Sequence, residues 1–199
     1  LGWRADNPVA HTSAIKRKTE GFTPWSEDDI AKFEAHWPSG SRERLALALL
    51  LYTGVRRSDV VSIGRQHVSD GRISVNQLKT TKRVSILIHP ALQAELDHAK
   101  GLTFLTTAYG KPFTAAGFTK WFRERAAMAG LENRTPHGLR KAAGRRLAEA
   151  GCTSKEIAAV LGHSTLSEVE GERGGDNLPV RQPSNPVGAE EPGHGVASD

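Results

Sequence analysis

The chain has 199 residues, of which 38% are hydrophobic and 6% aromatic, and its formal net charge at pH 7 is +5. Such a length buries one core of modest size, so we expect a single folded domain with appended segments rather than two domains. The sequence contains no run of about 18 apolar residues and no N-terminal signal peptide, so neither a membrane span nor secretion is indicated.

An arm and a first helix are predicted at the beginning of the chain. Residues 1–24 carry a basic stretch at Lys16–Lys18 and no hydrophobic periodicity, so we expect a linker or arm. Because the first residue is Leu1 rather than Met, we expect a fragment. Ser26 and the three acidic residues after it then begin a helix over about 27–37.

The second predicted helix, over 41–52, is apolar on nearly all sides and is followed by Gly54. This pattern indicates a buried central helix with a glycine C-cap. A short helix is predicted to follow over 58–63. The turn between these two helices then contains Arg56 and Arg57.

A change of pattern at His67 predicts strands. Asp70-Gly71 is a hairpin-turn sequence, and polar and apolar residues alternate over 73–77 and again over 84–88. We therefore expect a three-stranded antiparallel sheet whose second turn is formed by Lys79–Lys82.

Further elements complete the patterned part of the chain: helices over 90–100, 114–129, 137–150 and 154–161, and a short strand over 103–105. A capping box from Thr153 to Glu156 begins the last helix. Cys152, the only cysteine, excludes an internal disulfide and a multi-thiolate metal cage, and we expect it to be a small buried packing residue in a reducing compartment. The order of elements predicts an α+β fold, mostly helical with a small three-stranded antiparallel sheet.

The sequence changes abruptly at Gly171. Residues 171–199 are rich in glycine and proline and lack aromatic residues, so we expect a disordered tail after a folded domain over 25–170. The residues before Gly171 hold 25 of the 27 basic and 17 of the 22 acidic residues, a net charge of +8. A basic domain is compatible with a polyanionic partner such as DNA. A positive net charge by itself, however, more often belongs to a basic protein with no such partner.

The segment Thr135–Arg140 carries the strongest local signal. His137 and Arg140 lie three residues apart at the start of a predicted helix and so project from one face. The planar guanidinium of Arg140 can bind two phosphate oxygens, and the imidazole of His137 can transfer a proton near neutral pH. The pair is therefore suited to binding and cleaving a phosphodiester. In an isolated His-x-x-Arg sequence, however, the histidine more often only caps the helix and the arginine pairs with a carboxylate.

Other segments change that balance. Arg56 follows a glycine-ended buried helix, His163 follows another glycine-ended helix, and Lys79 stands at a hairpin turn. Taken in order over 25–170, the Thr-Gly-x-Arg, turn-lysine, His-x-x-Arg and Leu-Gly-His boxes resemble those of the tyrosine recombinases, the phage integrase family. We put the chance that the ordered set is a coincidence below about one in twenty.

The resemblance implies catalytic roles for five residues. Arg56 and Arg140 would clamp the scissile phosphate and neutralise charge on its oxygens in the transition state. Lys79 would protonate the 5′ oxygen as it leaves, His137 would serve as general base or proton shuttle, and His163 would hydrogen-bond the phosphate. No cofactor and no metal ion are implied, because the two arginines supply the positive charge.

Some of these assignments have alternatives. Asp59, in the family's acidic position, would orient Arg56 or only compensate the dipole of its helix. Arg57 could take the place of Arg56, and Lys82 that of Lys79, but we prefer the motif positions. Candidates for further contacts to DNA are Arg57, Lys82, Lys141 and Arg145. A solvated polar face is the alternative for the two candidates on the His-x-x-Arg helix.

The nucleophile of the family is absent. Family members carry a tyrosine at the position nine residues beyond the Leu-Gly-His histidine, where this sequence has Glu172. The two tyrosines of the chain, Tyr52 and Tyr109, occur in the buried helix and in a turn. A carboxylate is repelled by phosphate and would form a labile acyl phosphate, so Glu172 cannot replace the phenol. We expect a frameshift or a truncated gene, and a tyrosine supplied by a neighbouring protomer is the alternative.

The resemblance thus predicts the catalytic domain of a site-specific DNA recombinase or integrase, acting by metal-free transesterification through a 3′-phosphotyrosine and cleavage-deficient in this chain. Its expected partner is double-stranded DNA, and we expect the intact protein to self-associate on DNA. We expect a cytoplasmic, nucleoid-associated location and no association with a membrane. Family members commonly carry an N-terminal helical DNA-clamping domain, and the start at Leu1 with linker-like first residues would fit its removal from this chain. The alternatives are a non-catalytic DNA-binding remnant or regulator, and a type IB topoisomerase catalytic domain, which also needs the tyrosine.

Overall fold

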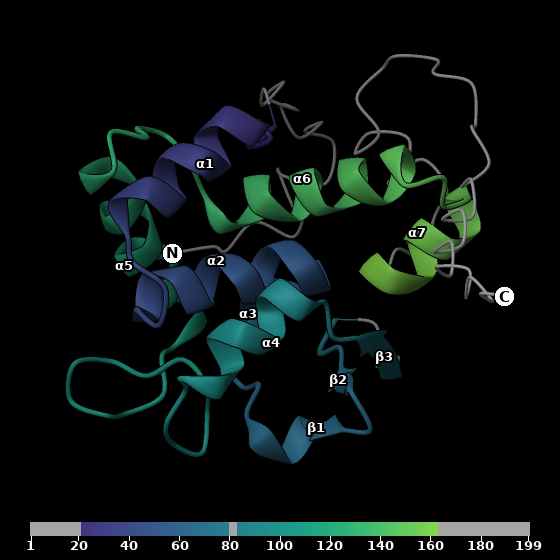
Figure 1. Ribbon diagram of the computed structural model, residues 1–199, viewed down its shortest axis with the longest axis horizontal. Coiled ribbons are helices and arrows are strands. Elements are labelled where there is room, and N and C mark those ends of the chain that lie inside the picture. Colours follow the sequence, from purple (N-terminus) through teal and green to yellow (C-terminus); the bar gives the residue numbers. More distant parts are fainter. Residues whose placement is uncertain (1–20, 80–82, 163–199) are drawn as a thin grey trace, which may run out of the picture.

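The computed structural model describes residues 21–79 and 83–162. In chain order its elements are α1 (Glu27–His36), α2 (Arg42–Thr53), α3 (Arg57–Val60), the 3-10 helix η1 (Arg65–His67), β1 (Val68–Ser69), β2 (Arg72–Asn76), β3 (Arg83–Leu87), α4 (Pro90–Asp97), α5 (Ala115–Met128), α6 (Pro136–Glu149) and α7 (Ser154–Leu161). The α+β fold predicted from the sequence is confirmed (Figure 1). No helix within the described ranges is long and apolar enough to cross a membrane.

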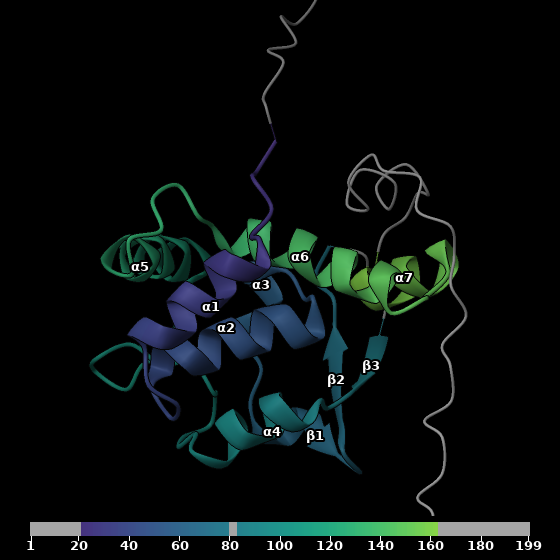
Figure 2. The ribbon, with the colours of Figure 1, turned by 45° about the horizontal axis from the view of Figure 1, so that its top comes forward.

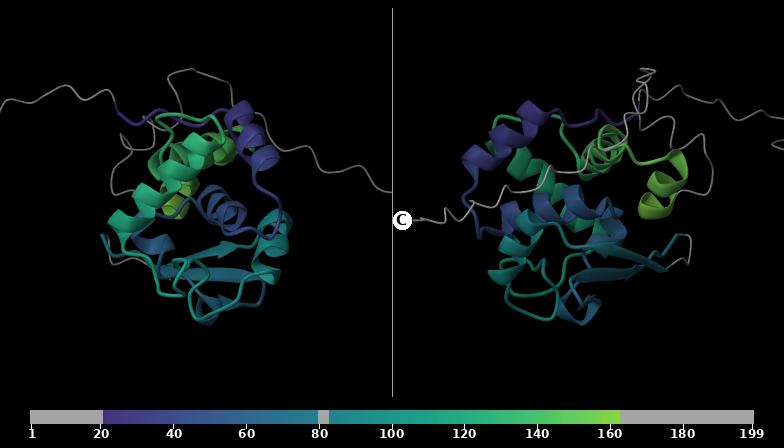
Figure 3. Two further views of the ribbon diagram at one scale, coloured as in Figure 1. Left: turned by 90° about the vertical axis from the view of Figure 1, so that its left-hand side faces the viewer. Right: turned by 45° about the vertical axis from the view of Figure 1, so that its right-hand side comes forward.

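Helix α2 lies at the centre of the fold, as its uniformly apolar sequence predicts. Nine of its twelve residues are buried, so it packs on nearly every side. Figure 1 shows it between α6 on one side and α4 on the other, and Figure 3 shows the sheet beneath it. The predicted glycine C-cap is confirmed, because Gly54 has a left-handed φ of 60° and its N–H donates to the carbonyl oxygen of Leu50.

A cluster of fully buried aromatic rings joins α1 and α5 to the segment before α1. The ring of Phe33 lies 5.6 Å from those of Trp25 and Phe122, and Phe118 lies 5.8 Å from Phe122. Large aromatic side chains contribute most to a core of this size because each removes about 150–250 Å² from water. Figure 2 shows α1 and α5 side by side, at the end of the molecule away from α7.

The three strands form an antiparallel sheet in the order β1-β2-β3, as predicted. Strands β2 and β3 pair over their full lengths, from Arg72 opposite Leu87 to Asn76 opposite Arg83. The predicted hairpin turn joins β1 to β2, and both of its residues, Asp70 and Gly71, have positive φ. Such a turn matches the twist of antiparallel strands and so fixes their register.

Two predicted elements differ in the structure. The helix expected over 58–63 ends after little more than one turn, and Ile63 lies beyond it, where its carbonyl oxygen accepts the N–H of Phe104 at 2.8 Å. The strand expected over 103–105 is wrong. That single bond to Ile63 is not continued into a ladder, so the segment remains irregular.

The predicted capping box of α7 is confirmed: the Thr153 hydroxyl accepts the N–H of Glu156, whose carboxylate accepts the N–H of Thr153. Cys152 was expected to be buried and is half-buried, packed against Ile157 and Leu161. Burial, and the nearby charge of Glu156, raise the pKa of the Cys152 thiol. The predicted arm up to residue 20 and the predicted tail lie outside the described residues.

Candidate functional site

Arg56 lies in the turn between α2 and α3, where the sequence placed it. Its Nη1 donates to Oε1 of Gln77 at 2.7 Å, and its Nη2 donates to the carbonyl oxygen of Gly162 at 2.9 Å. One half-buried guanidinium therefore joins the α2–α3 turn, the end of β2 and the end of α7. Both acceptors are neutral oxygens, whereas the half-buried Arg125 and Arg134 each pair with a carboxylate.

Arg140 lies in α6 and is only 3% exposed. Its Nη1 donates to the carbonyl oxygen of Gly54 at 2.5 Å, and its Nη2 donates to that of Leu161. These carbonyl groups lie at the C-terminal ends of α2 and α7, where the negative end of a helix dipole attracts a cation. The two arginines expected to clamp a phosphate thus meet consecutive carbonyl groups, those of Leu161 and Gly162, at one end of α7.

Two glycines with left-handed backbone allow this close approach. Gly54 has φ +60° and Gly162 has φ +63°. A Cβ atom on Gly54 would lie 2.4 Å from Cδ2 of Leu161, and one on Gly162 would lie 1.8 Å from Oε1 of Gln77. No residue with a side chain fits at either position without displacing its neighbours. This is the physical reason for glycine in the Thr-Gly-x-Arg and Leu-Gly-His boxes.

Lys79 follows β2 and is exposed. The backbone N–H of the preceding residue, Leu78, donates to Oδ1 of Asp59 at 3.3 Å. Asp59 is 1% exposed, and its Oδ2 finds no hydrogen-bond partner among the described residues. The recorded hydrogen bonds of Arg56 go to Gln77 and Gly162 and not to Asp59. Asp59 therefore holds the end of β2 beside Lys79, and it does not orient the guanidinium of Arg56.

The sequence interpretation did not single out Gln77, which the structure places in the site. Its side chain is 1% exposed and continues the inward-facing series of Ile73 and Val75 along β2. A buried polar side chain must find hydrogen-bond partners, and Arg56 is one of them. The sequence does contain an indication of this role, because a polar glutamine stands where the alternation of Ile73 and Val75 predicts an inward-facing apolar residue.

His137 lies in the first turn of α6 and is exposed. Its ring centroid lies 4.7 Å from that of Phe22, in the leading segment, residues 21–26. A Cβ atom on the next residue, Gly138, would lie 2.3 Å from the carbonyl oxygen of Thr23. The leading segment therefore packs directly against the turn of α6 that carries His137, while the arginine of the same box points into the protein interior.

Lys82, His163 and Glu172 lie outside the described residues. The described chain reaches Gly162, the direct neighbour of His163. In the part of the chain that the structure describes, no three His, Cys, Asp or Glu side chains gather in a way that could hold a metal ion.

Comparison with known proteins identifies the family. The model of the phage integrase family matches residues 24–171. The chain belongs to this family. The integrase of Mycobacterium phage L5 is 26% identical over 193 residues, which cover 81% of this chain and 50% of that protein. Tyrosine recombinase XerC of Herpetosiphon aurantiacus is 28% identical over 149 residues, which cover 67% of this chain and 48% of that protein.

A solved structure supports the same assignment. A lambda integrase tetramer bound to a Holliday junction has a TM-score of 0.68 and 27% sequence identity, over 83% of this chain and 53% of that chain. The chain thus spans about half the length of the family members it matches.

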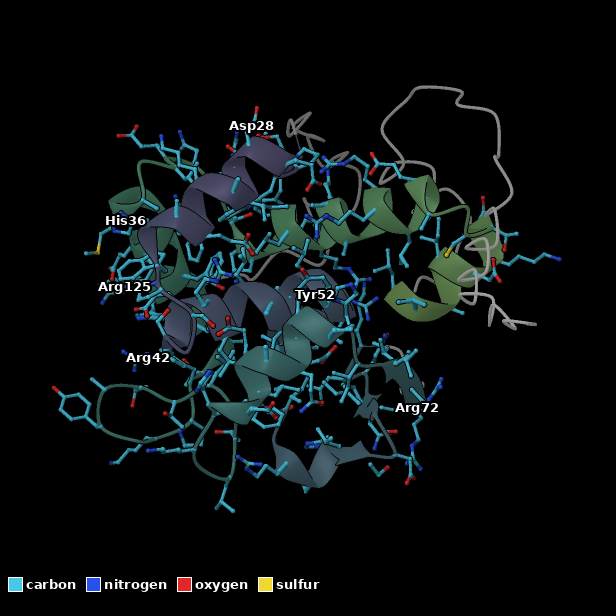
Figure 4. The ribbon with its side chains drawn as sticks, viewed as in Figure 1. Asp28, His36, Arg42, Tyr52, Arg72 and Arg125 are labelled. Carbon is cyan, nitrogen blue, oxygen red and sulfur yellow. The ribbon has the colours of Figure 1, made fainter. Side chains whose placement is uncertain are left out.

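The two tyrosines of this phage integrase family member lie in α2 and in the loop before α5. Tyr52 lies at the C-terminal end of α2 (Figure 4). Its ring stacks on that of His89, with a ring-centroid distance of 4.4 Å and an interplanar angle of 9°. Tyr109 is 89% exposed in the loop before α5. Figure 1 shows this loop at the opposite end of the molecule from α7.

The residues proposed from the sequence to contact DNA differ in their surroundings. Arg57 is exposed at the start of α3 and donates to Oγ1 of Thr119 on α5 at 2.8 Å. Lys141 is half-buried on α6. Arg145 donates to the carbonyl oxygen of Trp25 at 2.9 Å and to Oε1 of Glu27 at 2.6 Å. The recorded bonds of Arg145 therefore hold the leading segment against α6.

Glu27 completes this attachment of α1 to α6. Its carboxylate accepts hydrogen bonds from Arg145 and from both Nε and Nη2 of Arg146. The hydrogen bond from Arg146 is the largest cause that lowers the pKa of Glu27, and partial burial opposes it. The ionised form of Glu27 is therefore the form that the fold favours.

Glu27→Gln is expected to lower the free energy of unfolding by about 1 kcal/mol at neutral pH, the upper range for a partly exposed ion pair. Because the folded pKa lies below the ordinary value of 4.5, this contribution is present above pH 4.5 and is lost as the pH falls through the folded pKa. Urea unfolding should show the difference from wild type shrinking as the pH is lowered. Glu124→Gln, an exposed change on α5, is the control. A difference that is independent of pH contradicts the ion pair.

Proposed function

We propose that the chain is the catalytic domain of a site-specific DNA recombinase, over about residues 25–170, and that Arg56 and Arg140 bind one DNA phosphate. The observation that carries the proposal is the docking of both guanidiniums on the last carbonyl groups of α7, immediately before His163. The acceptors recorded for Arg56 are neutral and use two of its five N–H donors. Its charge is therefore not cancelled by these partners.

The family reaction assigns the remaining roles. A tyrosine hydroxyl attacks phosphorus, the bond to the 5′ oxygen breaks, and a 3′-phosphotyrosine forms. The tyrosine proton passes to His137 as general base, and Lys79 gives a proton to the departing 5′ oxygen. The two arginines stabilise the charge that builds on the non-bridging oxygens, and His163 donates a hydrogen bond to them.

For this chain we propose binding of duplex DNA by a recombinase catalytic domain that is deficient in cleavage. In the sequence, Glu172 stands at the position expected for the nucleophile, and the two tyrosines, Tyr52 and Tyr109, lie in α2 and in the loop before α5. Arg57, which is exposed, and Lys141 and Lys82 would add phosphate contacts that position the duplex. Because the lambda integrase neighbour is a tetramer on a Holliday junction, we also propose self-association on DNA, at the nucleoid.

Arg56→Ala is expected to weaken binding to a duplex of arbitrary sequence about tenfold at low salt, because one phosphate contact is lost. The slope of log affinity against log salt should fall by about 0.9. Fluorescence anisotropy over a salt series measures both. The control is Arg72→Ala at the opposite end of β2, an exposed arginine bonded to Ser85 (Figure 4). Equal losses in the two variants, or none in either, count against a phosphate site at Arg56.

A further inference from the structure

Gln77 contacts three elements that carry proposed catalytic residues. It directly follows β2 and stands two residues before Lys79. Its Oε1 accepts Nη1 of Arg56 at 2.7 Å, and its amide group fills the space where a Cβ atom of residue 162 would otherwise lie. The strand end, the α2–α3 turn and the C-cap of α7 are thereby packed against one buried side chain.

The bonds around Gln77 fix the guanidinium of Arg56 in one orientation. Nη1 is held by the glutamine and Nη2 by the carbonyl oxygen of Gly162, so rotation about the last bonds of the side chain would break one contact or the other. The chain beyond Gln77 is held separately, by the bond from the N–H of Leu78 to Asp59. The position of Lys79 relative to Arg56 is therefore set by two bonds one residue apart.

The chemistry of the acceptor matters as much as its position. A carboxylate in place of the amide would hold the guanidinium at least as firmly, because charge-assisted hydrogen bonds are the strong ones. It would also cancel the positive charge that a phosphate must meet. A neutral amide orients Arg56 and leaves its charge available to an anion. Arg134, in contrast, is fully paired with the carboxylate of Asp29.

We propose that Gln77 is a positioning residue that orients Arg56 toward the DNA phosphate, with Gly162 as the second support and without neutralising the guanidinium. This inference rests on the proposed function of Arg56. It adds to the family boxes a residue whose amide oxygen, rather than its charge, is the functional group.

The test uses the full chain and inorganic phosphate as the probe, followed by NMR of the arginine Nε–Hε groups. The resonance of Arg56 is identified by its loss in Arg56→Lys. In Gln77→Leu, this resonance is expected to move in the absence of ligand, and phosphate affinity is expected to fall about tenfold, the scale of one hydrogen bond to a charged group. In Gln77→Glu, the guanidinium should remain held while phosphate affinity falls. Gln93→Leu, on the exposed face of α4, is the matched control and should change neither quantity.

An Arg56 resonance and a phosphate affinity that are both unchanged in Gln77→Leu would overturn the proposal, as would phosphate affinity that is undiminished in Gln77→Glu. If wild type binds no phosphate, the proposed function fails, but the ligand-free resonance of Arg56 still decides the role of Gln77. If circular dichroism shows that Gln77→Leu is unfolded, Gln77→Asn is used in its place, because its side chain is shorter by one methylene group and moves the amide away from Arg56. It should then produce the same change in resonance, and an unchanged resonance rejects the positioning role.

Discussion

Arg140→Ala is expected to lower the free energy of unfolding by about 3 kcal/mol and to remove most of the affinity for duplex DNA. The side chain is 3% exposed, and its bonds to Gly54 and Leu161 tie α6 to the ends of α2 and α7. Without the guanidinium, two buried carbonyl groups lose their donor, at a cost of about 1–3 kcal/mol each. The same change removes one of the two cations proposed to hold the phosphate. Urea unfolding and fluorescence anisotropy measure the two losses.

Arg140→Lys separates the structural part of this effect from the electrostatic part. Lysine keeps the positive charge, but its compact ammonium group lacks the planar fork that spans the carbonyl groups of Gly54 and Leu161. We expect most of the stability loss to remain and part of the DNA affinity to return. Wild-type stability in Arg140→Ala would contradict the bridging role, and unchanged DNA binding at low salt would contradict the phosphate role.

Gly162→Ala is expected to cost about 3 kcal/mol of stability and to weaken DNA binding. Two terms add at this position. The left-handed backbone costs an L-residue about 1–2 kcal/mol, and a methyl group 1.8 Å from Oε1 of Gln77 forces that side chain away, at about 1–3 kcal/mol. Since Gln77 and the carbonyl group of Gly162 both hold Arg56, the displacement reaches the proposed phosphate site.

Gly71→Ala is the matched control for this substitution. Gly71 also has a left-handed backbone, with φ +68°, but a Cβ atom there would meet nothing within 4 Å. It should therefore show only the backbone cost, about 1–2 kcal/mol, and no change in DNA affinity. Equal stability losses in the two alanine variants, measured by urea unfolding, would show that the close approach of Gly162 to Gln77 has no energetic weight.

Much of the fold could be predicted because local patterns and tertiary packing agree. The apolar run before Gly54 fits a helix that is buried on nearly all sides, and the Asp70-Gly71 turn and the alternation after it predict a hairpin. The strand expected over 103–105 failed for a tertiary reason. Its apolar residues are buried, but the bond from Phe104 to Ile63 has no neighbour to extend it, and sequence periodicity does not report on that.

The sequence motifs name candidate site residues, but they do not predict the contacts that these residues make. The order of the boxes indicated Arg56 and Arg140, but their acceptors lie 21 to 106 residues away. All but Gln77 are backbone carbonyl groups of residues in the other boxes, and a motif does not show which side chain such a carbonyl group will bind. The packing of the leading segment over His137 was equally hidden. In the sequence, residues 1–24 resemble a linker. The structure shows that the carbonyl oxygen of Thr23 and the ring of Trp25 occupy the space that a Cβ atom on residue 138 would need, which explains the glycine after His137.

A search for a covalent protein–DNA adduct tests directly whether this chain binds DNA without cleaving it. The full chain is incubated with nicked duplexes of randomised sequence around the nick, and products are separated on a denaturing gel, with a tyrosine-bearing family member on its own site as positive control. We predict salt-sensitive binding of these duplexes and no adduct, because neither Tyr52 nor Tyr109 lies at the nucleophile position of the sequence. An adduct that survives denaturation would contradict this prediction, and mapping the modified residue would identify the nucleophile.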